Sequence, residues 1–378
     1  MPDGEIGLLL KRHRGERHVI ALQDYPDPDA IGSAMAHRHF SHAFQIQTDI
    51  VFAGEISHHQ NRKLVELLKV DLHHVRDGYP LKAADGAVFI DNQGTTCPYL
   101  VRLLERANVP TVLVVDHHEG EGPLHPELRI QEPVGATSTL YAELFRRGEL
   151  SLDPTSPDGR RRATARLQGI QPDTQRLASA TPRDLHAAAW LTPLGDAAVL
   201  DQVDQERIPF ETGEVLARAS TNRLGRHGFL FAGVGYLQAR HRDALPQAAA
   251  WLLTQDDVHT SVVFGIVRDW RLQETLAGSL RTVVSSPSPH DFLQRALGPG
   301  AGPEIARGGR PFAGGFEIPI GMSTRASSTE FQMARWAYYE HLILGRLLRA
   351  AEETSRISSG TATHLAGDRR SKTTDMHG

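Results

Sequence analysis

Along this chain, short runs of β-branched and other apolar residues end abruptly at acids or histidines. In the sharpest case, the apolar residues 112–115 run directly into Asp116, His117 and His118. An uninterrupted apolar run of this length is typical of a strand that is buried on both faces, as in a parallel sheet. Because ligands of open α/β sheets bind beyond the carboxyl ends of the strands, we expect this polar triplet to face a binding site.

Two further apolar runs lead to carboxylates. Residues 18–22 are followed closely by Asp27 and Asp29, and residues 87–90 run into Asp91. Hard divalent cations prefer carboxylates, and an imidazole among them favours manganese or another transition metal. The combined pattern therefore predicts a metal site, although each acid taken alone is equally well explained as the cap of a following helix.

Strand-like and helix-like segments alternate through residues 1–195, which predicts an α/β catalytic domain with a doubly wound, mainly parallel sheet. A helical linker is expected over residues 196–225, followed by a smaller α+β domain over residues 226–352. Residues 353–378 are polar and are predicted to be disordered.

Composition narrows the class of protein. The chain has 378 residues, enough for two domains with their own cores. It has 41 lysines and arginines against 45 aspartates and glutamates, a net charge of −4 that argues against tight binding to long duplex DNA. Cys97 is the only cysteine, so a disulfide framework and a cysteine-based zinc site are excluded. Neither a membrane span of about 20 apolar residues nor a signal-peptide segment is evident, so a soluble, cytoplasmic protein without a membrane partner is expected.

Other segments carry candidate chemistry. Asp173 is a further acid of interest, and His58 lies beside His59 at a predicted helix start, where it is a candidate substrate contact or simply exposed. Four glycines fall within eight residues near the C-terminus, namely Gly308, Gly309, Gly314 and Gly315. Backbone N–H groups in such a run can approach a phosphate closely, although turns also use glycine.

Taken in order, these motifs resemble those of the DHH phosphoesterase superfamily. More narrowly, the chain looks like the branch with a DHH-associated C-terminal domain that contains nano-RNases and pAp phosphatases. The resemblance covers roughly residues 15–320. Asp27 and Asp29 match the first motif, Asp91 the second, Asp116-His117-His118 the third, and Asp173 the fourth. The segment with Gly308, Gly309, Ala313, Gly314 and Gly315 resembles the family's Gly-Gly-His substrate-binding loop.

The chain departs from the family pattern at two positions. Gln23 stands four residues before Asp27, where the family commonly has a histidine that binds metal. Arg310 replaces the histidine of the Gly-Gly-His loop. An amide oxygen can still coordinate a cation, and an arginine offers charge-assisted donors to phosphate.

The resemblance implies a hydrolase with two manganese ions, with Mg²⁺ or Co²⁺ as alternatives, and an active site in the cleft between the two domains. Gln23 and Asp27 would face one metal, Asp29, His117 and Asp173 the other, and Asp91 would bridge them. Asp116 would orient the histidine pair, and His118 would contact the phosphate or protonate a leaving oxygen. Arg281, Arg310 and the glycine-rich segment would hold the rest of the nucleotide.

We therefore expect a metal-dependent phosphoesterase that hydrolyses short oligoribonucleotides, 3′,5′-bisphosphonucleosides such as pAp, or both. Two alternatives stay open. One is an enzyme that cleaves cyclic dinucleotides or their linear products. The other, suggested by Gln23, is a catalytically impaired nucleotide-binding protein. The expected partners are short RNA or small phosphorylated nucleotides, and a homodimer is also open.

Overall fold

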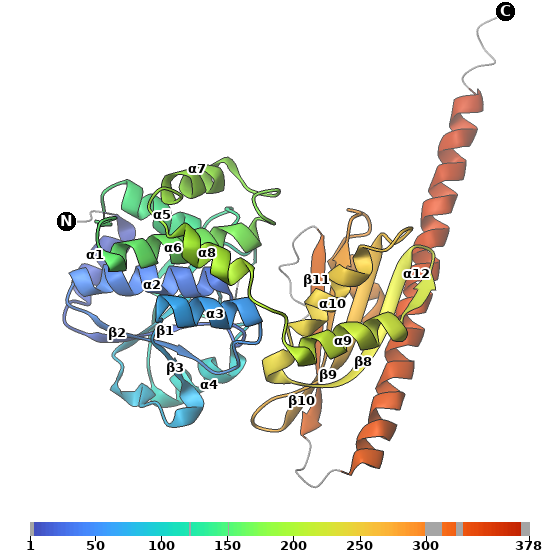
Figure 1. The fold of residues 1–378 in the computed structure, drawn as a ribbon, viewed down its shortest axis with the longest axis horizontal. Coiled ribbons are helices and arrows are strands. Elements are labelled where there is room, and N and C mark those ends of the chain that lie inside the picture. The colour runs from blue at the N-terminus through green and yellow to red at the C-terminus, as the bar shows by residue number, and fades with distance from the viewer. Residues whose placement is uncertain (1–3, 121, 150, 299–311, 323–327, 372–378) are drawn as a thin grey trace, which may run out of the picture. The chain divides into compact units, whose positions relative to one another are not determined.

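The computed structural model describes residues 4–120, 122–149, 151–298, 312–322 and 328–371 (Figure 1). The chain divides into two compact units, Met1–Ile208 and Pro209–Gly378, which we call unit 1 and unit 2. The division falls within the segment for which a helical linker was predicted. Among the described residues, no helix combines the length and the apolar character needed to cross a membrane.

Unit 1 is built on a six-stranded parallel sheet with the strand order β3-β2-β1-β4-β5-β6. Its strands are β1 (Arg17–Ala21), β2 (Gln47–Phe52), β3 (Leu72–His74), β4 (Gly86–Ile90), β5 (Thr111–Asp116) and β6 (Leu128–Gln131). The order of the strands reverses between β1 and β4. Such a switch point opens a crevice at the carboxyl ends of the strands, where ligands of doubly wound sheets bind. The predicted doubly wound, parallel sheet is confirmed.

Helices cover both faces of this sheet. Successive side chains of a strand point to opposite faces, so each strand contributes to two cores. Ile20, Ile50 and Val88 belong to the core on the face covered by α2, and Val19 and Phe89 belong to the core on the face covered by α4. The helices of unit 1 are α1 (Glu5–Arg12), α2 (Pro28–Ala43), α3 (His59–Leu68), α4 (Pro98–Ala107), α5 (Thr137–Arg146), α6 (Pro157–Asp173), α7 (Pro182–Leu191) and α8 (Ala197–Asp204), with short 3₁₀ turns at Val75–Asp77 and Leu81–Ala83.

Unit 2 is an α+β unit, as predicted, with a mixed five-stranded sheet in the order β11-β10-β9-β8-β7. Only β8 and β9 pair in parallel. The strands are β7 (Leu224–Arg226), β8 (Phe229–Gln238), β9 (Thr260–Arg268), β10 (Gln273–Thr282) and β11 (Ala313–Met322), and the helices are α9 (Phe210–Thr221), α10 (Ala244–Leu253), α11 (Pro289–Leu297) and α12 (Thr329–Ser371), with a 3₁₀ turn at Ala239–His241. Side chains of α11 and α12, such as Phe292 and Ile343, share one core with Phe231 and Phe264 of the sheet.

The C-terminal helix differs from the sequence prediction of a disordered tail from residue 353. Helix α12 continues to Ser371, and residues 372–378 lie outside the described residues. The polar residues that suggested disorder include good helix formers such as Glu353 and Arg356. A helix satisfies its own backbone hydrogen bonds, so a polar sequence does not exclude it.

Candidate metal centre

His117 follows the carboxyl end of β5, and its ring faces carboxylates from three other segments. The Nε2 atom lies 3.4 Å from Asp173 Oδ2, 3.5 Å from Asp91 Oδ1 and 3.9 Å from Asp29 Oδ2. The Nδ1 atom lies 3.0 Å from the carbonyl oxygen of Val134. A proton on Nδ1 would be donated to that carbonyl, which leaves the Nε2 lone pair directed at the carboxylates. A metal-binding histidine is commonly fixed in this way.

The potential ligand atoms form two groups that share this histidine. Within each group, all the ligand atoms lie within 4.8 Å of one another. The first group consists of Asp29, His117 and Asp173, and the second of Asp91, Asp116, His117 and His118. Strand-end acids that are far apart in the sequence are therefore brought together, and the second group adds Asp116 and His118 to the metal ligands that the sequence predicted.

Asp29 lies in the first turn of α2 and accepts hydrogen bonds from the start of α5. It is fully buried, and its two carboxylate oxygens accept the backbone N–H groups of Thr137 at 2.6 Å and Ser138 at 2.7 Å. The amino end of a helix carries a partial positive charge, which favours a carboxylate at this place. The pKa of Asp29 is nevertheless raised, first by burial and then by the negative charge of Asp173.

Asp91 ends β4 in an unusual backbone conformation. Its φ is 58°, in the left-handed region that residues with a side chain rarely adopt, and such strain is concentrated at functional sites. Its Oδ1 atom accepts a hydrogen bond of 2.9 Å from the hydroxyl of Thr137. Burial raises its pKa well above the ordinary value, and the charge of Asp29 raises it further.

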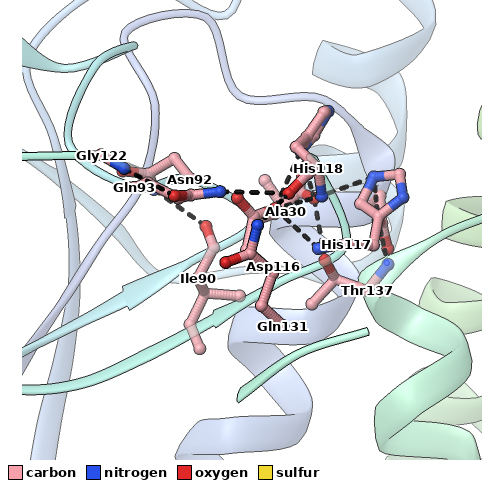
Figure 2. Close-up of polar contacts among 12 residues, drawn as sticks. Ala30, Ile90, Asn92, Gln93, Asp116, His117, His118, Gly122, Gln131 and Thr137 are labelled. Atoms are coloured by element: carbon pink, nitrogen blue, oxygen red, sulfur yellow. Dashed lines mark hydrogen bonds and ion pairs between the residues drawn. The ribbon is translucent and has the colours of Figure 1, made fainter. Parts of the chain in front are cut away.

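Asp116 holds the histidine pair through one carboxylate oxygen. Its Oδ1 atom accepts the backbone N–H groups of His117 at 2.8 Å and His118 at 3.2 Å, and it lies 2.8 Å from His118 Nδ1 (Figure 2). Burial raises the pKa of Asp116, but the hydrogen bond and the charge of His118, together with Gln93 and His117, outweigh it and leave the pKa below its ordinary value. The centroids of the two imidazole rings are 4.2 Å apart. This is the arrangement expected of a residue that orients both histidines.

The residues of this centre fit a divalent cation. Two buried atoms, His117 Nε2 and Asp91 Oδ2, have no hydrogen-bond partner in the described part of the chain. Burial would lower the pKa of His117, but the nearby carboxylates of Asp173 and Asp29 raise it to about 9. Clustered buried carboxylates repel one another unless a positive charge lies between them. Carboxylate and imidazole donors together suit Mn²⁺ and other first-row transition metals.

The sequence comparison agrees with this geometry. Residues 18–167 match the model of the DHH family, N-terminal domain. Unit 1 contains a DHH-family domain. An uncharacterized protein of Methanocaldococcus jannaschii is 31% identical over 314 residues, which make up 82% of this chain and 60% of that relative. The chain thus spans only part of the length of the curated relative that it matches.

Two solved structures were compared with this chain, and one of them shares its fold. An exopolyphosphatase-related protein from Bacteroides fragilis has a TM-score of 0.59 at 15% identity, over 91% of this chain and 96% of that chain. The exonuclease RecJ bound to manganese has a TM-score of 0.41 at 16% identity, over 92% of this chain and 94% of that chain. The similarity to the exopolyphosphatase-related protein is one of fold.

One supporting residue of this domain was not identified from the sequence. Thr181 and Asp184 form a capping box at the start of α7. In the structure, the buried carboxylate of Asp184 also accepts the backbone N–H of Gly135 at 2.9 Å and the hydroxyl of Thr139 at 2.6 Å. A Cβ atom at Gly135 would come within 2.6 Å of Asp184 Oδ2. Asp184 therefore fixes the turn that presents Thr137 to the metal centre.

Three predicted site residues are outside the two ligand groups of histidines and acids. Gln23 is half-buried, and a glutamine is not among the residue types of these groups. Asp27 lies outside both groups, although its charge contributes to the raised pKa of Asp91, and it caps α2 by accepting the N–H of Ala30 at 2.9 Å. His58 precedes α3 and stacks on His59, with ring centroids 4.6 Å apart. The assignment of these three residues to metal or substrate stays a prediction.

The predicted substrate-binding residues of unit 2 that the structure describes lie on two paired strands. Arg281 of β10 pairs with Ala313 of β11, and Leu280 and Ser279 pair with Gly314 and Gly315. The Arg281 guanidinium donates to Ser279 Oγ at 2.9 Å. Gly308, Gly309 and Arg310 lie outside the described residues.

Proposed function

We propose that this protein is a metal-dependent phosphoesterase that hydrolyses short oligoribonucleotides, 3′,5′-bisphosphonucleosides such as pAp, or both. The observation that carries the proposal is the cluster around His117, whose Nε2 atom faces the carboxylates of Asp29, Asp91 and Asp173. Buried carboxylates around an imidazole suit divalent cations, and paired cations are used in hydrolytic displacement at phosphorus. Membership of unit 1 in the DHH family supports the same reaction class.

The proposal assigns a ligand set to each cation. Asp29, His117 and Asp173 would hold one, Asp27 and Gln23 would hold the other, and Asp91 would contact both. When bound, two divalent cations lower the pKa of a water molecule and neutralise charge on the phosphoryl group. Manganese is the favoured ion because the ligand set mixes carboxylates with an imidazole, and Mg²⁺ or Co²⁺ are alternatives.

The remaining residues of the DHH motif orient the substrate and move protons. The side chain of His118 is 38% exposed, while that of Asp116 is buried. With its Nδ1 held by Asp116, the His118 ring can present Nε2 to a phosphate oxygen or donate a proton to the leaving oxygen. Arg281 would hold a second phosphate or the sugar of the nucleotide, as a charge-assisted donor.

A substrate panel with a metal titration tests this proposal. The metal-free protein is supplied with Mn²⁺, Mg²⁺ or Co²⁺ and assayed with pAp, linear dinucleotides, a five-residue oligoribonucleotide and cyclic di-AMP. We expect release of phosphate from pAp or of mononucleotides from the short RNAs, dependent on Mn²⁺. Preferential cleavage of cyclic di-AMP would instead favour the cyclic-dinucleotide alternative.

The same panel addresses the possibility of a protein that only binds nucleotides. Binding of pAp or a dinucleotide in a dialysis experiment, without turnover under any of the three metals, would contradict the enzymatic proposal. An Asp91→Asn variant serves as the control in each assay, because it removes a carboxylate of the metal centre while keeping nearly the same side-chain volume.

A further inference from the structure

A second cluster of metal-binding side chains lies at the other end of β1. The sequence His13-Arg14-Gly15-Glu16-Arg17-His18 connects α1 to this strand. His13 is the residue that ends α1, and Gly15 turns the chain with a φ of +86°. Glu16 and His18 are two residues apart on extended backbone, so their side chains lie on the same side. The turn brings His13 back over this pair.

The three side chains meet at one carboxylate oxygen. Glu16 Oε2 lies 2.8 Å from His13 Nδ1 and 2.9 Å from His18 Nε2. On its other side, His13 Nε2 lies 3.2 Å from Oε1 of Glu127, which comes from the segment before β6. His18 is fully buried, and the side chains of His13 and Glu16 are 13% and 34% exposed. The cluster is thus screened from solvent on one side and accessible on the other.

We propose that His13, Glu16 and His18 form a second metal site, which takes a Zn²⁺-type cation, and that Glu127 orients the His13 ring through Nε2 so that Nδ1 faces the cation. Ligand atoms of the three central residues lie within 4.8 Å of one another, and the site shares no residue with the centre around His117. Two imidazoles with one carboxylate are a common protein ligand set for zinc, with water as a fourth ligand. Bonds of about 2.0–2.1 Å to a tetrahedral ion hold neighbouring ligand atoms roughly 3.3 Å apart. The observed spacings of 2.8–2.9 Å therefore need only a small expansion.

The protonation state of the cluster is compatible with this role. A histidine must be neutral to bind a metal. Burial lowers the pKa of His18 despite the neighbouring carboxylate, so its ring is neutral near pH 7. The pKa of Glu16 is lowered as well, because hydrogen bonds from His18 and His13 outweigh burial, so the carboxylate is charged. A neutral imidazole and a charged carboxylate are the forms that bind a cation.

The competing explanation is a cluster held by hydrogen bonds alone, with both imidazoles donating to Glu16. Glu16→Gln separates the two, because the amide oxygen of glutamine still accepts hydrogen bonds but binds zinc far more weakly than a carboxylate. His13→Gln removes a second ligand at the partly exposed end of α1, where a polar residue is tolerated. His73→Gln is the control, since this histidine is 37% exposed and belongs to neither the cluster nor the centre around His117.

The experiment measures zinc bound per chain after equilibrium dialysis against Zn²⁺ at pH 7.5, together with the thermal midpoint with and without zinc. The parent and His73→Gln should bind one more zinc per chain than Glu16→Gln or His13→Gln. The affinity of that ion should fall by roughly tenfold or more in both variants. Without zinc, all four proteins should unfold at similar temperatures. Equal zinc content in the parent and in a folded Glu16→Gln variant would overturn the proposal and leave a hydrogen-bonded cluster.

Discussion

Thr137 donates its hydroxyl to Asp91 Oδ1 over 2.9 Å, which ties the first residue of α5 to the carboxylate that ends β4. The backbone N–H of the same threonine donates to Asp29. One residue therefore holds two of the carboxylates of the metal centre. The sequence pattern gave Thr137 no part in the site.

We predict that Thr137→Val weakens manganese binding by roughly tenfold, within the range found when a partner of a metal ligand is removed. Valine keeps the shape and the backbone N–H but loses the hydroxyl, so only the hydrogen bond to Asp91 is removed. Thr137→Ser keeps the donor and serves as the control. The measurement is the manganese concentration at half-saturation. An unchanged value for Thr137→Val would mean that Asp91 is held in place without this bond.

Asp91→Asn should abolish turnover and leave the fold intact. The substitution removes a charged ligand between the two groups, and the metal-free protein should be as stable as the parent or more stable, because less buried negative charge is confined there. The measurements are turnover with Mn²⁺ and urea unfolding without it. Asp71→Asn, at an exposed position, is the control for a carboxylate-to-amide change. Near-normal turnover in Asp91→Asn would contradict the two-metal assignment.

The part of the site that follows from strand ends could be predicted from the sequence. Apolar runs identify buried parallel strands, and the carboxyl ends of such strands share one edge. Asp29, Asp91 and the Asp116-His117-His118 triplet were predicted in this way. Asp173 ends a helix, α6, so its place beside His117 depends on tertiary packing that the pattern does not encode. Only the family resemblance assigned it to the site.

Edge strands and supporting contacts were missed for a different reason. The strands β3 and β6 lie at the two edges of the sheet of unit 1, and all their residues are only partly buried. They lack the apolar run that marks a central strand. Asp184 stabilises Gly135 across 49 residues of sequence, and a single sequence gives no sign of such a contact.

The stability of the metal-free protein should depend on pH through His117. Its pKa is raised from 6.5 to about 9 in the folded chain, so the stabilisation is fully present below pH 6.5 and is lost as the pH rises through 9. Bound metal requires the neutral imidazole. We therefore expect the stabilisation by Mn²⁺ to increase from pH 6 to pH 9. Urea unfolding with and without Mn²⁺ at several pH values measures this, and a His117→Gln variant should lose the dependence.

The buried side chain of Arg166 should lower the free energy of unfolding of the protein. It is fully buried, its guanidinium lies 4.2 Å from the centre of the Phe145 ring, and its nitrogens have no hydrogen-bond partner among the described residues. Burial lowers its pKa to about 9. Arg166→Met keeps much of the volume and the contact with the ring, so we expect the free energy of unfolding to rise by roughly 1–4 kcal/mol. A large loss of stability would show instead that the buried charge has a partner, such as a bound anion.

The last prediction concerns Gln23→His, at the position where the resemblance to DHH phosphoesterases implies a histidine. A neutral imidazole binds manganese more strongly than an amide oxygen does. If Gln23 contacts one of the two cations, the substitution should lower the manganese concentration needed for half-maximal activity, by an equivalent of about 1–2 kcal/mol. The maximal rate should change little, because Asp91 and the ligands of the other cation are unaltered. A superimposable titration with unchanged metal content would remove Gln23 from the site. The cation assigned to Gln23 and Asp27 would then depend on Asp27 and Asp91. Asp116 and His118 of the second ligand group would be further candidate ligands.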